Sequence, residues 1–352
     1  MKRVAPAPRI ALSLLAVCLL ISTGCGRPPV DQLDLTTLLP GEPAWIVSSD
    51  LRSLQQSETW HELQGLWMGG SGLPAGVEQF LDEAGIDREK DLARLMGGLY
   101  DNGTQNVEFA AVLTGRFDRR QLLPALERQG FTIGAHREVP LLTPPDRGGH
   151  GGPDPDHPFL VCFDDTAIGL AATEAGAAGL IDRLLDGGES LEQHPEFGPL
   201  LAEMDRTSPL WAAGLLAAED MEGLDSRLPM KGMIPALSNL GISAWTEEGL
   251  QLSAVTLLAD AEAATKLAGQ LNGWVKLAAG LMQANPQWFG EAAADADDDT
   301  LPLVVETLDK VIVGSVASAV RLEADIPAEL LRRAAEQVGT TSPASTGLPR
   351  QE

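Results

Sequence analysis

The chain has 352 residues and a formal net charge of −25, with 44% apolar, 21% charged and 5% aromatic residues. An apolar fraction near the globular average can bury a core, so the composition excludes a disordered polyanion. The acidic balance also argues against nucleic-acid binding, because neutralising phosphates requires a basic surface. We therefore expect an acidic globular protein without a nucleic-acid partner.

The N-terminus predicts export. Residues 1–9 contain three basic residues and no acidic residue, and the run Ile10–Ile21 is apolar except for one serine. This run has the length of a signal-peptide core and is shorter than the roughly 20 residues that span a bilayer. Small residues then lead to Gly24 and Cys25, and we expect cleavage after Gly24. We therefore predict a signal peptide over residues 1–24.

The cleavage region resembles the lipobox of bacterial lipoproteins. In that family the residue after the cut is a cysteine whose thiol is diacylated and whose amine is then acylated, which implies lipidation at Cys25. Ser22 departs from the pattern, since the family has an aliphatic residue there. Two alternatives stay open, an ordinary secretory signal cut at the same Gly24–Cys25 bond and an uncleaved anchor.

A lipidated Cys25 implies attachment to a membrane through the lipid. By resemblance to the lipoproteins of diderm bacteria, Gly26 in place of aspartate implies the outer membrane, facing the periplasm, if the host is diderm. Cleavage removes basic residues and no acidic residue, so the mature body is still more strongly repelled by anionic lipid. We expect the acyl chains to supply the attachment, at about 0.8 kcal/mol per buried CH₂.

Composition along the mature chain predicts an ordered body between two polar ends. Residues 25–43 hold the lipidated N-terminus and a proline-containing tether, and residues 339–352 form a Ser/Thr/Pro/Gly-rich tail that we expect to be disordered. At about 150 residues per domain, the length between these ends suggests two units. We predict modules at 44–218 and 242–338, joined by an irregular connector at 219–241.

Hydrophobic periodicity predicts that both modules combine strand pairs with helices. Val107–Thr114 is a buried-strand run, and Asp118 is a helix N-cap before the apolar-faced helix Arg119–Gln129. The same order of buried strand, aspartate and apolar-faced helix is repeated in the segment that begins at Leu250. A hairpin of strands Phe159–Phe163 and Ala167–Ala172 is expected before a helix at Ala175–Leu185. A second hairpin, of strands Val311–Val316 and Ala319–Ala324, is expected before a helix at Ala328–Gln337. We predict an α+β fold of two ββαββα modules, related as an internal repeat, whose antiparallel sheets carry helices on one face.

The run Ala111–Asp118, followed by two leucines, resembles a short sequence pattern that recurs in uncharacterised exported bacterial proteins. Those proteins are α+β families of unknown function, often lipoproteins, so the resemblance implies the same fold class and export. A strand, a tight glycine turn and an N-capped helix explain every residue of this pattern. The resemblance implies no activity.

Two polar stretches are candidate cation sites. Asp295, Asp297, Asp299 and Glu306 occupy positions 1, 3, 5 and 12 of an EF-hand-like loop, where oxygen ligands hold calcium. A threonine replaces the glycine of position 6, so we favour an acidic surface loop and keep calcium as the alternative. Residues 146–157 group histidines with aspartates, and we favour a solvated loop because the many glycines and prolines hold no fixed geometry.

The sequence contains no recognisable catalytic constellation. It has no G-x-S-x-G, H-E-x-x-H or C-x-x-C motif, and its five histidines form no cluster of known type. Cys162 lies in the apolar run Phe159–Phe163 and is interpreted as a buried core thiol. We predict a non-catalytic binding or assembly component of the cell envelope, without a cofactor and with an envelope protein as partner. The alternative is a periplasmic carrier or sensor of a small apolar ligand.

Overall fold

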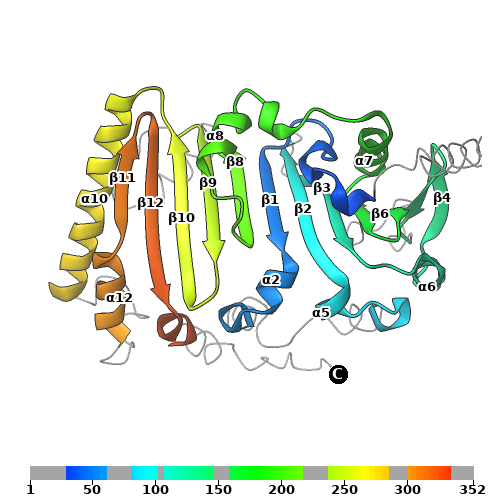
Figure 1. Cartoon of the computed structure of the whole chain (residues 1–352), viewed down its shortest axis with the longest axis horizontal. Coiled ribbons are helices and arrows are strands. Elements are labelled where there is room, and N and C mark those ends of the chain that lie inside the picture. Colours follow the sequence, from blue (N-terminus) through cyan, green and yellow to red (C-terminus); the bar gives the residue numbers. More distant parts are fainter. Residues whose placement is uncertain are drawn as a thin grey trace, which may run out of the picture.

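The structure of the protein is a computed structural model, shown in Figure 1. It describes residues 29–61, 81–101, 107–145, 158–216, 237–284 and 300–333. Within these ranges the strands join into one 12-stranded sheet in the order β11-β12-β10-β9-β8-β1-β2-β3-β7-β6-β5-β4. Every strand pair of the sheet is antiparallel. The predicted α+β class with antiparallel pairing is therefore confirmed.

The bounds of the elements agree with many of the predicted ranges. The strands are β1 (Trp45–Asp50), β2 (Leu92–Asp101), β3 (Val107–Gly115), β4 (Thr132–His136), β5 (Val139–Thr143), β6 (Phe159–Asp164), β7 (Ala167–Ala171), β8 (Leu210–Leu215), β9 (Asn239–Trp245), β10 (Gly249–Leu257), β11 (Ile312–Val316) and β12 (Ala319–Pro327). The helices are α2 (Leu51–Gln55), α5 (Arg88–Asp91), α6 (Arg119–Arg128), α7 (Glu174–Asp186), α8 (Phe197–Glu203), α10 (Ala261–Ala284) and α12 (Thr300–Asp309). Three short 3-10 helices are η1 (Val30–Gln32), η2 (Leu35–Thr37) and η3 (Leu191–Gln193). The predicted strand and helix around Asp118 match β3 and α6 to within one residue.

The sheet has the same strand order on both sides of its centre, where β1 pairs with β8 (Figure 1). Outward from β1 the order is β2, β3, β7, β6, and outward from β8 it is β9, β10, β12, β11; β5 and β4 follow β6 and have no counterpart among the described strands of the other side. In each half, three consecutive strands form a meander, β1–β2–β3 in the first and β8–β9–β10 in the second. A later hairpin then adds its second strand to the third strand of the meander, so β7 pairs with β3 and β12 pairs with β10. Both halves therefore share one continuous sheet, and the second half begins with β8, which the prediction puts in the module at 44–218. Duplication of one unit stays a prediction, and most of the predicted connector at 219–241 lies outside the described residues.

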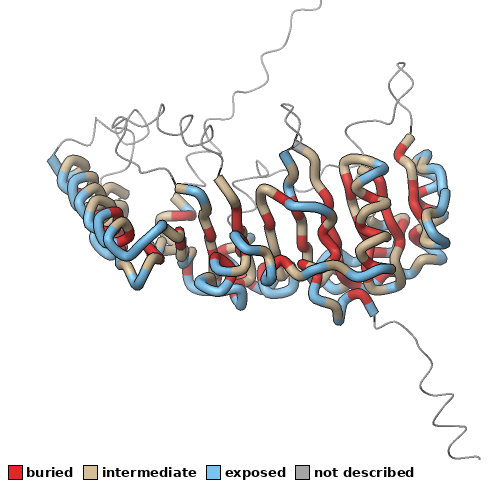
Figure 2. Tube along the Cα trace, turned by 90° about the horizontal axis from the view of Figure 1, so that it is seen from above, coloured by how far each residue is buried: buried red, intermediate tan, exposed pale blue. Residues whose placement is uncertain are grey.

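Helices lie on both faces of the sheet in its first half, which corrects the prediction of one covered face. Neighbouring residues of β6 and β7 point to opposite faces. Val161 and Ala171 pack in the same core cluster as α7, whereas Cys162 and Ile168 pack with α6. Because both sets of alternating residues are apolar, these strands require cover on both sides. Figure 2 shows the buried positions most densely gathered in this half of the molecule.

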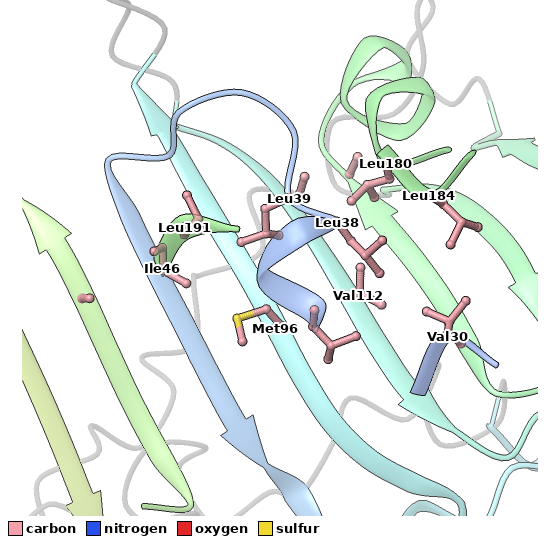
Figure 3. Packing of buried hydrophobic residues seen from close by; sticks show 14 of the residues in the cluster. Val30, Leu38, Leu39, Ile46, Met96, Val112, Leu180, Leu184 and Leu191 are labelled. Atoms are coloured by element: carbon pink, nitrogen blue, oxygen red, sulfur yellow. The ribbon is translucent and has the colours of Figure 1, made fainter. Parts of the chain in front are cut away.

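The segment before β1 belongs to the folded body, which corrects most of the predicted tether. Figure 3 shows Leu38 and Leu39 over β1–β3, beside the α7 residue Leu180. Val30, Leu38 and Leu39 are each 2% exposed. The segment consists of single 3-10 turns, which are too short to show a helical period in the sequence. Residues 25–28, which run from the predicted lipidation site to the first described residue, are here called the N-terminal linker.

A cluster of ion pairs holds the β4–β5 hairpin against α7. The hairpin turns through Arg137 and Glu138, whose φ angles of 49° and 72° suit an Asn-Gly turn and strain other residues. Arg137 Nη1 lies 2.6 Å from Asp186 Oδ2 and 3.1 Å from Asp182 Oδ1. His136 Nε2 lies 2.9 Å from the same Asp182 oxygen. These contacts stabilise a turn that its own backbone angles disfavour.

Acidification is expected to weaken the contact of this hairpin with α7, because it removes the Asp182 contacts while Arg137 still pairs with Asp186. Hydrogen bonds from His136 and then Arg137 hold the pKa of Asp182 below its ordinary value of 3.8. Because the folded-state pKa is depressed, the stabilisation is present above the ordinary value and is lost as the pH falls through the folded-state pKa. Nuclear magnetic resonance of the β4 amides, followed into acid, should show this step. It should vanish in Asp182→Asn and persist in the control Asp325→Asn, and a step that persists in both would contradict the assignment.

Candidate functional site

A cleft of about 1070 Å³ lies between the β3–α6 loop, the β6–β7 turn and the residues around α5. We call it the β3–α6 cleft. Apolar side chains such as Phe117 and Leu123 form part of its wall. Its charged lining residues are Asp91, Arg116, Asp118, Arg119, Arg120 and Asp165. The cleft therefore presents guanidinium and carboxylate groups at one end of the sheet.

Backbone contacts fix the loop that forms the cleft. The Gly115 amide donates to the Thr166 carbonyl at 2.8 Å, and a Cβ added to Gly115 would lie 2.1 Å from the Asp91 carbonyl oxygen. Phe117 anchors the next turn, since it is 3% exposed. Asp118 then caps α6, accepting the Arg120 amide at 2.9 Å, as predicted. Only glycine fits where β3 passes the end of α5 this closely.

The arginines of the cleft differ in their surroundings. Arg116 Nη2 lies 3.1 Å from Asp91 Oδ1 and donates to the Lys90 carbonyl at 3.1 Å, while the Arg116 side chain stays 66% exposed. The Nε of Arg119 is buried and has no hydrogen-bond partner within the described part of the chain. Arg120 is exposed. Guanidinium groups in this arrangement can donate to the oxygens of an anion.

The described part of the chain begins beside this cleft. The Val30 amide donates to Asp164 Oδ2 at 3.3 Å, and Asp164 Oδ1 accepts from the Thr166 amide at 2.7 Å. Asp164 therefore closes the β6–β7 turn and holds the start of the chain on it. The neighbouring residue, Asp165, lines the cleft, and its carbonyl accepts the Phe117 amide at 2.8 Å. The described part of the chain thus begins close to the charged groups of the cleft.

Most residues that the sequence singles out lie outside the described ranges. They are Gly24 and Cys25 of the cleavage region and Asp295, Asp297 and Asp299 of the acidic loop, together with residues 146–157. Glu306 lies on α12, where its Oε1 is 2.7 Å from Lys310 Nζ. This pairing lowers the pKa of Glu306. Among the described residues no three His, Cys, Asp or Glu side chains gather as a metal site, so calcium stays an untested prediction.

The thiol and two of the histidines have structural surroundings. Cys162 is 0% exposed, and burial raises the pKa of its thiol to about 11, which confirms the predicted core thiol. The Nδ1 of His194 accepts the Glu196 amide at 3.3 Å. The Nε2 of His61 lies 3.0 Å from the Gln55 carbonyl oxygen. These contacts hold turns and helix ends.

Sequence reasoning missed the β3–α6 cleft. Asp118 is visible in the sequence as an N-cap and Arg116 as part of a turn, but Asp91 and Asp165 come from other elements. The signal that could have drawn attention to it is the presence of three arginines within residues 116–120, in a chain with 25 basic and 50 acidic residues.

Comparisons with known proteins identify the fold and no family. No family model and no curated protein matches the sequence. Crystal form III of TP0453, a Treponema protein, is 8% identical with a TM-score of 0.50, and the match covers 88% of this chain and 99% of that one. Crystal form I has a TM-score of 0.48 at 8% identity, covering 87% and 98%. The likeness to form III shows a shared fold. Within the described ranges, no helix combines the length and apolarity needed to cross a bilayer.

Proposed function

We propose that this protein is an exported lipoprotein of the bacterial cell envelope, anchored through Cys25, whose body is a non-catalytic binding or assembly component. The observation that carries the proposal is the position of Val30, which is 2% exposed and lies five residues after the predicted lipidation site. The body is therefore held within a short distance of the membrane, as a component that works at the membrane surface requires. In a diderm host we place it at the outer membrane, facing the periplasm.

The shared fold supports an envelope role. TP0453, whose crystal form III this chain resembles, is an outer-membrane-associated lipoprotein. At 8% identity no residue of that protein can be matched to a role here. The support concerns the class of protein.

The described side chains support binding rather than chemistry. The Cys162 thiol is buried with a raised pKa, so it is a poor nucleophile. His136 and His194 are engaged in contacts that hold a hairpin and a helix end. A carrier of a small apolar ligand would need an apolar cavity that encloses its ligand. The β3–α6 cleft is instead lined by six charged residues, which favours the binding component over the carrier.

Replacing Cys25 by serine is expected to release the protein from the membrane fraction. The wild-type protein should show the mass of residues 25–352 plus acyl chains and should partition into the detergent phase, because the lipid is the anchor. Intact-mass measurement and detergent partition of both forms test this. Cys162→Ser is the matched control, since that thiol is in the core and should leave the partition unchanged. Membrane attachment of Cys25→Ser would contradict the proposal. A wild-type mass without acyl chains would indicate a secreted protein and favour the carrier.

A further inference from the structure

The β3–α6 cleft and the start of the described chain lie at the same end of the sheet. The Val30 amide donates to Asp164, and the next residue, Asp165, lines the cleft and accepts the Phe117 amide. The five steps from Cys25 to Val30 span at most about 18 Å when fully extended. A lipid on Cys25 therefore holds the cleft close to the bilayer surface.

Three arginines of the cleft supply donors for a phosphate group. Arg116, Arg119 and Arg120 all line it, and guanidinium groups bind phosphate oxygens through paired hydrogen bonds. The Nε of Arg119 is buried without a hydrogen-bond partner among the described residues. A buried donor that lacks an acceptor costs free energy, so a movement of the Arg119 side chain that brings this nitrogen to a ligand oxygen is stabilising.

Three carboxylates of the same cleft restrict the charge of the anion. Asp91, Asp118 and Asp165 balance the three arginines, so the formal charge of the six residues is zero. Asp118 also accepts a hydrogen bond from the Arg120 amide, so this N-terminal amide of α6 already has an acceptor within the protein. A phosphate monoester carries about −1.5 to −2 charges at neutral pH and would be repelled by these carboxylates. A phosphodiester carries a single negative charge and is repelled less.

We propose that the β3–α6 cleft binds the phosphodiester group of a membrane phospholipid. The inference rests on the proposed function, because the lipid on Cys25 brings the cleft to the bilayer. A protein with a net charge of −25 is repelled as a whole by anionic lipid, and this cleft gives it a local surface that accepts a headgroup. The contact orients the body, with this end of the sheet toward the membrane and the opposite end toward an envelope partner.

The test uses the mature chain, residues 25–352, carrying Cys25→Ser, so that the body alone can bind. The probe is a vesicle of phosphatidylethanolamine and phosphatidylcholine, and binding is measured by flotation over a range of lipid concentrations. We expect the chain to float with the vesicles. We expect Arg116→Gln with Arg120→Gln to weaken the apparent affinity at least about tenfold, because each removes a guanidinium from the cleft.

A matched control removes the same charge elsewhere. Arg206 and Arg321 form ion pairs with Glu192 and Glu203 near α8, at the other end of the sheet. The double variant Arg206→Gln with Arg321→Gln should float like the parent chain. Circular dichroism of each variant checks that it is folded.

Three outcomes would overturn the inference. In the first, the Cys25→Ser chain does not float with the vesicles. In the second, the cleft variant and the control variant float equally well. In the third, inorganic phosphate displaces the chain from the vesicles, which would make the cleft a site for free anions. The proposed function is judged separately, by the mass of the wild-type protein. A wild-type mass without acyl chains would contradict the anchor and leave the flotation result standing.

Discussion

Replacing Leu38 by alanine is expected to lower the free energy of unfolding by about 2–5 kcal/mol. Leu38 is 2% exposed and packs in the core cluster that contains Ile46, Val112 and Leu180 (Figure 3). Truncation removes buried methyl groups and leaves a cavity between η2 and the sheet. Chemical denaturation of the mature protein, followed by circular dichroism, measures the loss.

The matched control for this prediction is Leu277→Ala. Leu277 lies on α10 and is 50% exposed, so its truncation should change the free energy of unfolding by only a few tenths of a kcal/mol. If Leu38→Ala costs no more than Leu277→Ala, the segment before β1 contributes little to the core. The N-terminal linker would then be effectively longer, and the body would be held less closely to the membrane.

Replacing Gly115 by alanine is expected to destabilise the protein by about 1–3 kcal/mol, the usual cost of overpacking. The added Cβ would lie 2.1 Å from the Asp91 carbonyl oxygen, which is a backbone atom and cannot rotate away. Relief requires β3 and the end of α5 to separate. The same movement would strain the hydrogen bond from the Gly115 amide to the Thr166 carbonyl, and with it one wall of the β3–α6 cleft.

Gly273→Ala on α10 is the control for the glycine substitution. A Cβ at Gly273 meets nothing within 4 Å, and alanine is the better helix former by up to about 1 kcal/mol. This variant should therefore be as stable as the parent or slightly more stable in thermal and chemical unfolding. Equal stability of the Gly115 and Gly273 variants would show that the contact between β3 and α5 yields without cost.

Local signals explain why part of the fold could be predicted. Strand β3, the N-cap Asp118 and helix α6 lie within about 20 consecutive residues, where alternation, capping and helical period are all visible in the sequence. Cys162 is readable as a core thiol because the residues around it are apolar. Sequence signals of this kind depend on neighbours along the chain.

Contacts between residues that lie far apart in the sequence could not be predicted. Asp91 lies 25 positions before Arg116, and neither neighbourhood shows that α5 and the β3–α6 loop meet. The hydrogen bond from Val30 to Asp164 joins residues 134 positions apart. The candidate site therefore depends on pairings that the topology makes.

The sequence by itself determined the class of the fold, the capped helices and the buried strands, because these follow from local periods and turns. The tertiary structure alone decided that both halves share one sheet through the β1–β8 pair and that helices cover both faces of its first half. It also placed η1 and η2 in the core, and it brought Asp91 and Asp165 from other elements to the four charged residues at 116–120 in one cleft. The reason is physical: an apolar face or a charged group acquires its partner only when the chain folds, and burial of those faces selects which distant segments meet.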